Sequence, residues 1–149
     1  IFIAVPTPPN PDGSCNTSLV ESVTASIQGE KIIVIKSTIP QGTTDELQYK
    51  FPHHKFLFNP EFLTEFTADQ NMTFPDRQII GYTKQSYQVA ADIMQILPVA
   101  PFEKIMPATE AEMVKYFGNT WLATKNRRSI AVNLHLPNTL PPGPLQAKI

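Results

Sequence analysis

The sequence has one cysteine, no long apolar run and no run of basic residues, and each absence excludes a class of protein. A lone cysteine, Cys15, cannot form a disulfide within the chain and fits a reducing compartment, so we expect a cytoplasmic location. No stretch approaches the ~20 apolar residues that span a bilayer, which argues against a membrane partner. The 12 Lys and Arg residues nearly balance the 13 Asp and Glu residues, so the charge gives no footprint for nucleic acid.

Glycine is also scarce. The six glycines stand at positions 13, 29, 42, 81, 118 and 143. No three of them have the Gly-x-Gly-x-x-Gly spacing that lines a helix start for a dinucleotide pyrophosphate. The adjacent histidines His53 and His54 have no cysteine or third ligand at useful spacing. Neither a glycine-rich phosphate turn nor a metal site is therefore predicted.

Short apolar runs alternate with stretches of helical period along most of the chain. The predicted strands are residues 1–5, 32–35, 56–58, 78–82 and 102–106, and the predicted helices are residues 18–28, 44–51, 86–97 and 109–125. Alternating strands and helices indicate an α/β fold with a mainly parallel sheet and flanking helices. Residues 126–149 are rich in proline and lack a clear period, so we predict an irregular tail after a domain of residues 1–125.

Local spacing also predicts how the helices begin and which faces they bury. Three pairs have the spacing of a capping box, namely Ser18 with Glu21, Thr43 with Glu46, and Thr109 with Glu112. Apolar stripes predict three buried faces, formed by Leu19, Val23 and Ile27, by Val89, Ile93 and Leu97, and by Met113, Phe117 and Trp121.

Polar residues follow two of the predicted strands where a ligand would be expected. Thr38 comes after the strand at 32–35, and Glu61 and Glu65 come after the strand at 56–58. In open α/β sheets, ligands bind outside the carboxyl ends of the strands. Lys115 and Asn119 are four residues apart, so they share one face of a helix and could donate to a developing oxyanion. Each residue also has a plain structural interpretation, as a turn-closing threonine, solvated carboxylates or ordinary helix-surface side chains.

Five segments together resemble the nucleotide-sugar dehydrogenases that include UDP-glucose 6-dehydrogenase. They are residues 1–8 (IFIAVPTP), 36–43 (KSTIPQGT), 58–65 (FNPEFLTE), 75–81 (PDRQIIG) and 110–125 (EAEMVKYFGNTWLATK). The resemblance implies a partial Rossmann-like, NAD-binding domain. It also implies a family that oxidises a sugar alcohol to a carboxylate through a cysteine-bound intermediate, with NAD as cofactor and a nucleotide sugar such as UDP-glucose as substrate.

The resemblance also implies roles for seven residues. Thr38 would lie beside the nicotinamide, Glu61 would transfer protons and activate water, and Glu65 would lie on the cofactor side. Phe62 and Leu63 would hold the sugar nucleotide, partly through their backbone. Lys115 and Asn119 would stabilise the oxyanion at the carbon under attack.

Two parts of the family pattern do not occur in this sequence. The glycine-rich turn would precede residue 1, and the nucleophilic cysteine belongs to a later domain, since Cys15 matches no such motif. We therefore expect a truncated domain that binds NAD weakly and is not active alone. The alternatives are a non-enzymatic binding or assembly module, and an active half that borrows the missing parts from another chain. An uncovered edge on the strand at 1–5 would favour a homo-oligomer.

Overall fold

The computed structural model describes residues 1–62 and 75–135, and it divides into two compact units, Ile1–Tyr116 and Phe117–Ile149. The strands are β1 (Phe2–Ile3), β2 (Ile32–Ile35), β3 (Lys55–Phe58), β4 (Arg77–Tyr82) and β5 (Phe102–Pro107). The helices are α1 (Ser18–Ser26), α2 (Thr43–Lys50), α4 (Tyr87–Ile96) and α5 (Ala108–His135). Within the described residues, no helix combines the length and apolarity needed to cross a membrane.

The five described strands form one sheet in the order β1-β2-β3-β4-β5. β1, β2 and β3 are parallel, β4 is antiparallel to β3, and β5 is parallel to β4. The predicted α/β fold with a mainly parallel sheet and flanking helices is therefore confirmed. The strand predicted at residues 1–5 is shorter, because the backbone N–H and C=O of Val5 bond to the Ser37 hydroxyl at 2.8 and 2.7 Å instead of continuing the ladder.

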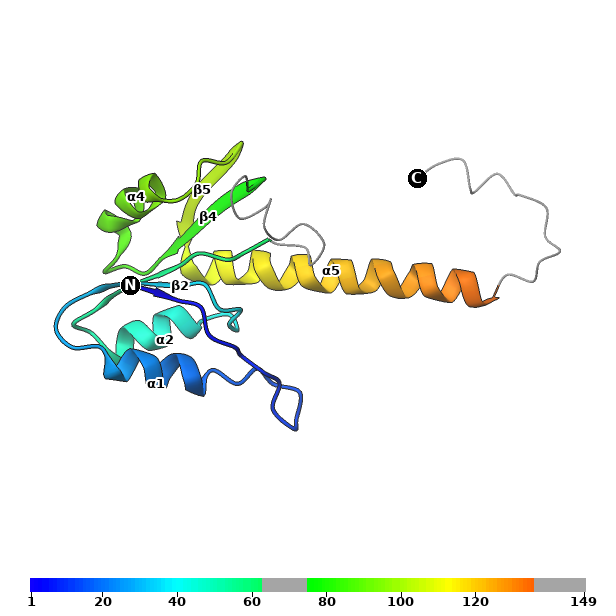
Figure 1. Cartoon of the computed structure of the whole chain (residues 1–149), viewed down its shortest axis with the longest axis horizontal. Helices are drawn as coiled ribbons and strands as arrows, with labels where there is room; N and C mark the ends of the chain where they lie inside the picture. The colour runs from blue at the N-terminus through cyan, green and yellow to red at the C-terminus, as the bar shows by residue number, and fades with distance from the viewer. Residues whose placement is uncertain (63–74, 136–149) are drawn as a thin grey trace. The chain divides into compact units, whose positions relative to one another are not determined.

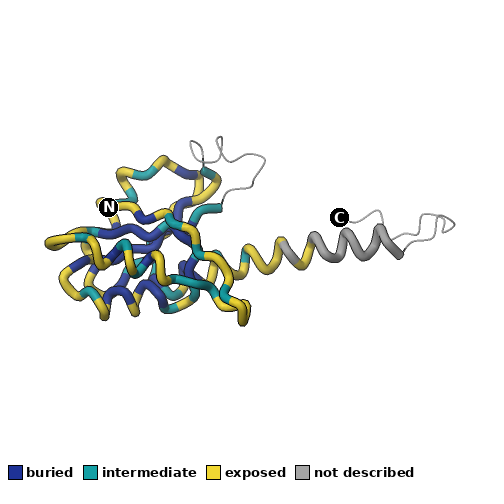
Figure 2. The backbone as a smooth tube through the Cα atoms, turned by 60° about the horizontal axis from the view of Figure 1, so that its bottom comes forward, coloured by how far each residue is buried: buried dark blue, intermediate teal, exposed yellow. Residues whose placement is uncertain are grey.

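Helices cover both faces of this sheet (Figure 1). α1 and α2 pack on one face, where they enclose Ile33, Phe56 and Phe58, and α4 packs on the other, against Val34 and Leu57. Buried residues accordingly concentrate in the strands (Figure 2). The uninterrupted apolar run of β2 follows from this arrangement, because successive side chains enter cores on opposite faces.

The predicted capping boxes of α1 and α2 are wrong. Thr17, not Ser18, precedes α1, and Gly42 precedes α2, and neither helix has a side-chain hydrogen bond from its own cap residue. The predicted stripe of α1 is also partly wrong. Val20 and Thr24 are its buried residues, while Leu19 is exposed. The stripe of α4 agrees better, since Val89, Ile93 and Leu97 pack partly buried against the core.

The buried face of α5 differs from the predicted one. Met113, Phe117 and Trp121 are 52%, 71% and 62% exposed, so the prediction that they are buried is wrong. The fully buried residues near the start of α5 are two alanines and a glutamate, Ala108, Ala111 and Glu112. The physical reason is a close approach to β4 at Gly81, which only small side chains allow. α5 also continues past its predicted end at residue 125, to His135.

Candidate functional site

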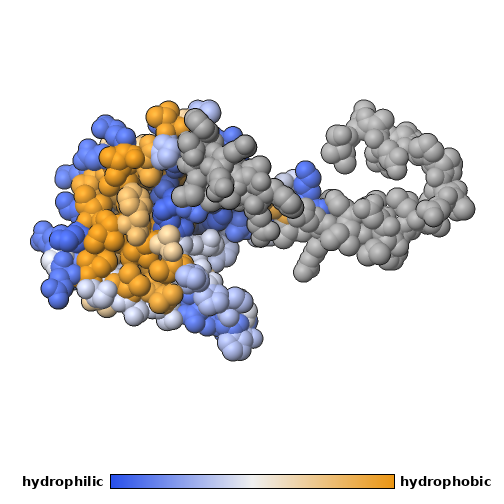
Figure 3. Space-filling model, in the orientation of Figure 1, coloured by the Kyte–Doolittle hydropathy of each residue, from blue (hydrophilic) through white to orange (hydrophobic). Residues whose placement is uncertain are grey.

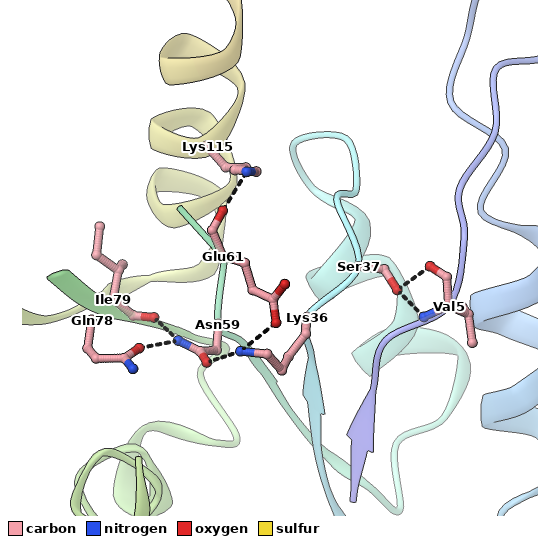
Figure 4. A network of polar contacts seen from close by, with 8 residues as sticks. All are labelled: Val5, Lys36, Ser37, Asn59, Glu61, Gln78, Ile79 and Lys115. Atoms are coloured by element: carbon pink, nitrogen blue, oxygen red, sulfur yellow. Dashed lines mark hydrogen bonds and ion pairs between the residues drawn. The ribbon is translucent and has the colours of Figure 1, made fainter. Parts of the chain in front are cut away.

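The segments that follow β2 and β3 meet at one edge of the sheet. Because these strands are parallel neighbours, their carboxyl ends lie side by side. The Lys36 ammonium lies 3.2 Å from the Glu61 carboxylate and donates a 2.9 Å hydrogen bond to Asn59 Oδ1. Figure 4 shows Lys36 reaching from the end of β2 to both of these residues.

Asn59 holds this edge together. It is fully buried, and its side-chain amide donates to the Ile79 carbonyl at 2.8 Å and to Gln78 Oε1 at 3.1 Å. Its backbone N–H donates to Ile35 at 2.8 Å. Asn59 therefore joins β2, β3 and β4 through one side chain and one peptide group, and it fixes the path of the chain that leads to Glu61.

Lys115 reaches the same place from α5. Its ammonium donates a hydrogen bond to the backbone carbonyl of Glu61 (Figure 4). Burial lowers the pKa of Lys115, and the nearby Glu61 carboxylate partly opposes that shift. Two cations lie over the ring of Phe62. Lys115 Nζ is 5.7 Å from the ring centroid, and the Arg77 guanidinium is 5.0 Å from it. The cluster thus presents three cations around one carboxylate and one aromatic ring.

A pocket of about 230 Å³ opens beside this cluster, with Lys36, Glu61, Phe62, Asp76 and Arg77 in its lining. Cations and carboxylates together can bond the hydroxyls and oxyanions of a polar ligand. The volume is below the ~300–1,000 Å³ typical of sites for small organic ligands. The pocket is therefore smaller than a typical site for a whole small organic ligand.

Thr38 lies at the end of β2, and its described hydrogen bonds lead away from Glu61. Its carbonyl accepts a 2.7 Å bond from the Thr7 hydroxyl and lies 3.7 Å from the Cys15 sulfur. Cys15 in turn lies beside Tyr116. The pKa of Tyr116 is raised to about 12, mainly by burial and to a smaller extent by the nearby Cys15 and Glu112. The segment after β2 thus divides its contacts, with Lys36 facing Glu61 and Thr38 facing the chain that follows β1.

The first turn of α2 receives a carboxylate from far along the chain. The N–H groups of Gly42 and Thr44 donate to Glu112 at 2.6 and 2.9 Å, and the Thr44 hydroxyl donates at 2.6 Å. Burial raises the pKa of Glu112 despite these three donors. The predicted pairing of Thr109 with Glu112 at the start of α5 is therefore wrong, because Glu112 caps α2 instead.

The structure brings some of the predicted site residues together. Glu61 and Lys115 are in contact, and Phe62 lies beneath Lys115. Asn119 is an exposed residue of the second unit, and its predicted role stays a prediction. Leu63 and Glu65 lie outside the described residues.

The sequence predicts no role for three residues of the site, which are Lys36, Asn59 and Arg77. For Glu112 it predicts only a capping box with Thr109, which the structure does not contain. Lys36 and Asn59 each follow directly after a predicted strand, a position that could have marked them. Arg77 carries no such local signal, because its partner Phe62 lies in another segment. The spacing of Glu112 from Thr109 is a local signal, but it indicates the wrong partner. Among the described residues, no group of three or more His, Cys, Asp or Glu side chains could hold a metal ion.

Known proteins with similar sequences show to which family the chain belongs. Residues 1–97 match the NAD binding domain of the UDP-glucose/GDP-mannose dehydrogenase family. The chain belongs to this family. A UDP-glucose 6-dehydrogenase of Streptococcus pneumoniae is 34% identical over 144 residues, which cover 85% of this chain and 36% of that protein. The family resemblance of the sequence is thus confirmed.

Solved structures of dehydrogenases agree with the Rossmann-like fold. A UDP-glucose dehydrogenase from the archaeon Pyrobaculum islandicum superposes with a TM-score of 0.70 at 35% identity, over 82% of this chain and 31% of that one. A GDP-mannose dehydrogenase of Pseudomonas aeruginosa gives a TM-score of 0.66 at 27% identity, over 83% of this chain and 32% of that one. This family member therefore spans about a third of the length of its relatives.

The family binds NAD, so a helix start of this chain could be expected to bind the NAD pyrophosphate. A dinucleotide pyrophosphate usually binds free N–H groups at a glycine-lined helix start that follows a strand. α2 follows β2 through Gly42, but Glu112 already accepts from the N–H groups of Gly42 and Thr44. α1 follows Thr17 with no glycine-rich turn. Neither of these two helix starts therefore fits the pyrophosphate of NAD.

Proposed function

We propose that this chain forms the part of a nucleotide-sugar dehydrogenase site that binds the sugar and manages charge at the carbon being oxidised. The observation that carries the proposal is the convergence of Lys36, Glu61 and Lys115 at one edge of the sheet. The proposed substrate is UDP-glucose or a related nucleotide sugar, because relatives at 34% and 35% identity are named for UDP-glucose.

The chemistry of each side chain suits such a site. The Glu61 carboxylate would take the proton of the reacting hydroxyl, directly or through a water molecule. The Lys115 ammonium would donate to the alkoxide oxygen that forms, and the Asn119 amide would add a second donor. Phe62 and Leu63 would hold the sugar nucleotide partly through their backbone.

The cofactor side of the site is proposed to consist of Thr38 and Glu65. We also propose that this chain alone binds NAD weakly and does not complete the oxidation. The filled start of α2 supports weak binding, because Glu112 occupies the donors that a pyrophosphate would use. The absence of a cysteine in the family's nucleophile motif supports the lack of turnover.

Self-association through β1 is a further part of the proposal. Among the residues that the structure describes, β1 pairs with β2 alone, and its residue Phe2 is about half exposed. Apolar residues also form a band across one face of the first unit (Figure 3). An open strand edge with apolar side chains favours pairing with another copy. Light scattering should therefore report a dimer or larger species, and a monomer would contradict this part.

The free thiol of Cys15 supports a cytoplasmic location.

Titration calorimetry tests substrate binding. The chain should release or absorb heat with UDP-glucose, and the change Lys115→Met should weaken binding about tenfold or more, because a charged donor is lost. Lys104→Met is the control, since Lys104 is an exposed residue of β5. Equal affinity in the two variants would contradict the role of Lys115.

An activity assay tests the rest of the proposal. The chain is mixed with UDP-glucose and NAD, and the absorbance of reduced cofactor is followed. We expect no turnover by the chain alone and little heat in a calorimetric titration with NAD. Turnover by this chain alone would overturn the proposal that it cannot complete the reaction.

A further inference from the structure

Glu112 is a fully buried carboxylate whose partners all lie at the start of another helix. It is 0% exposed and accepts from the Gly42 N–H, the Thr44 N–H and the Thr44 hydroxyl. Glu112 lies 70 positions after Gly42 and 68 positions after Thr44 in the sequence. Glu112 therefore ties α5 to the segment between β2 and α2, which also carries Lys36 and Thr38.

The same face of α5 carries Lys115. Ala108, Ala111, Glu112 and Lys115 have the spacing i, i+3, i+4 and i+7, which places them along one stripe of the helix. The alanines approach Gly81, Glu112 bonds α2, and Lys115 bonds the Glu61 carbonyl. A rotation or slide of α5 that broke the bonds of Glu112 would therefore also withdraw Lys115 from Glu61.

A capping function alone does not explain this arrangement. A serine, threonine or aspartate at position 42 would cap α2 locally and would stay near the surface. The chain instead has Gly42 with φ of +91°, and it buries a carboxylate from another helix. That burial is unfavourable enough to raise the pKa of Glu112 although three donors oppose the shift. Unlike a local cap, this contact joins α5 to the start of α2.

We propose that Glu112 is a positioning residue, which holds α5 in the register that places the Lys115 ammonium at Glu61. The inference rests on the proposed function, since Lys115 is the residue assigned there to the oxyanion. Glu112 does not touch the substrate in this proposal. It acts only through Lys115.

The experiment compares Glu112→Ala and Glu112→Gln with Glu110→Ala, which removes an exposed carboxylate from the same helix. Isotope-labelled lysine reports the side-chain resonance of Lys115 by NMR, with Lys115→Arg used for assignment. Calorimetry with UDP-glucose reports affinity, and circular dichroism reports whether each variant is folded. A purely structural role would lower stability without moving the Lys115 resonance in folded protein.

In Glu112→Ala we expect the Lys115 resonance to move toward that of an exposed lysine and the affinity for UDP-glucose to fall about tenfold. Glu112→Gln keeps one acceptor oxygen for α2, so its resonance and affinity should lie closer to those of the unchanged chain. Glu110→Ala should behave as the unchanged chain does. An unmoved Lys115 resonance in folded Glu112→Ala would overturn the proposal.

A milder variant covers the case in which Glu112→Ala does not fold. Thr44→Val removes only the hydroxyl donor to Glu112 and keeps the backbone donor. It should shift the Lys115 resonance in the same direction by a smaller amount, and no shift would overturn the proposal. The NMR readout needs no ligand. If UDP-glucose fails to bind the unchanged chain, the proposed function fails, while the resonance still decides whether Glu112 positions Lys115.

Discussion

Gly81 of β4 and Ala108 of α5 lie so close together that a Cβ atom on Gly81 would be 2.8 Å from the Ala108 Cα. The same atom would be 2.9 Å from the Cβ of Ala111 and 3.4 Å from the Cβ of Phe58. Two of these neighbours belong to the first turn of α5 and one to the central strand β3. Gly81 therefore has no room for a side chain, and its contact sets how closely α5 approaches the sheet.

The change Gly81→Ala should lower the free energy of unfolding by about 1–3 kcal/mol, because the added methyl forces α5 away from β4. Urea unfolding followed by circular dichroism measures this. Gly118→Ala is the matched control, since a Cβ there would meet nothing within 4 Å and alanine favours a helix over glycine. We expect the control to match or exceed the stability of the unchanged chain. Equal stability of Gly81→Ala would show that α5 does not pack on β4 in this way.

The buried amide of Asn59 leads to a second prediction about stability. Asn59→Ala removes the donor to the Ile79 carbonyl and to Gln78 Oε1, so buried acceptors lose a partner. It also removes one acceptor of the partly buried Lys36. We expect a loss of about 2–3 kcal/mol in the free energy of unfolding. Asn10→Ala is the control, because the Asn10 amide bonds Ser14 in an exposed turn, and its effect should stay within about 0.5 kcal/mol. Similar urea midpoints for the two variants would contradict the role given to Asn59.

The sequence predicts the sheet well because the apolar runs record burial on both faces. The run Ile32–Ile35 corresponds to β2 without any shift, since successive residues enter opposite cores. The strand predicted at residues 1–5 is longer than β1, and residues 1–5 themselves give no sign of where the strand ends. The hydroxyl of Ser37, from the next strand's end, takes both backbone groups of Val5.

Helix faces and caps were predicted less well, because both depend on distant partners. The spacing of Thr109 and Glu112 fits a capping box, yet Glu112 bonds Gly42, 70 residues away. Large apolar residues on α5 suggested the buried face, while the close approach at Gly81 requires the alanine face. Helical periodicity predicts that the face with large apolar side chains is buried. The prediction fails where a helix backbone lies so close to a strand that only small side chains fit between them.

The contact of Lys115 with Glu61 gives a prediction about titration. Burial lowers the pKa of Lys115 from its ordinary value of 10.5, and the Glu61 carboxylate raises it again in part. Glu61→Gln removes that negative charge but keeps the backbone carbonyl to which Lys115 donates. We therefore expect the pKa of Lys115 to fall further in Glu61→Gln, as measured by NMR titration of labelled lysine side chains. Glu21→Gln removes the carboxylate of an exposed ion pair with Lys50 and should leave the Lys115 titration unchanged. A rise in the Lys115 pKa in Glu61→Gln would mean that the Glu61 carboxylate does not stabilise the ammonium, and the charge arrangement proposed for the site would then be wrong.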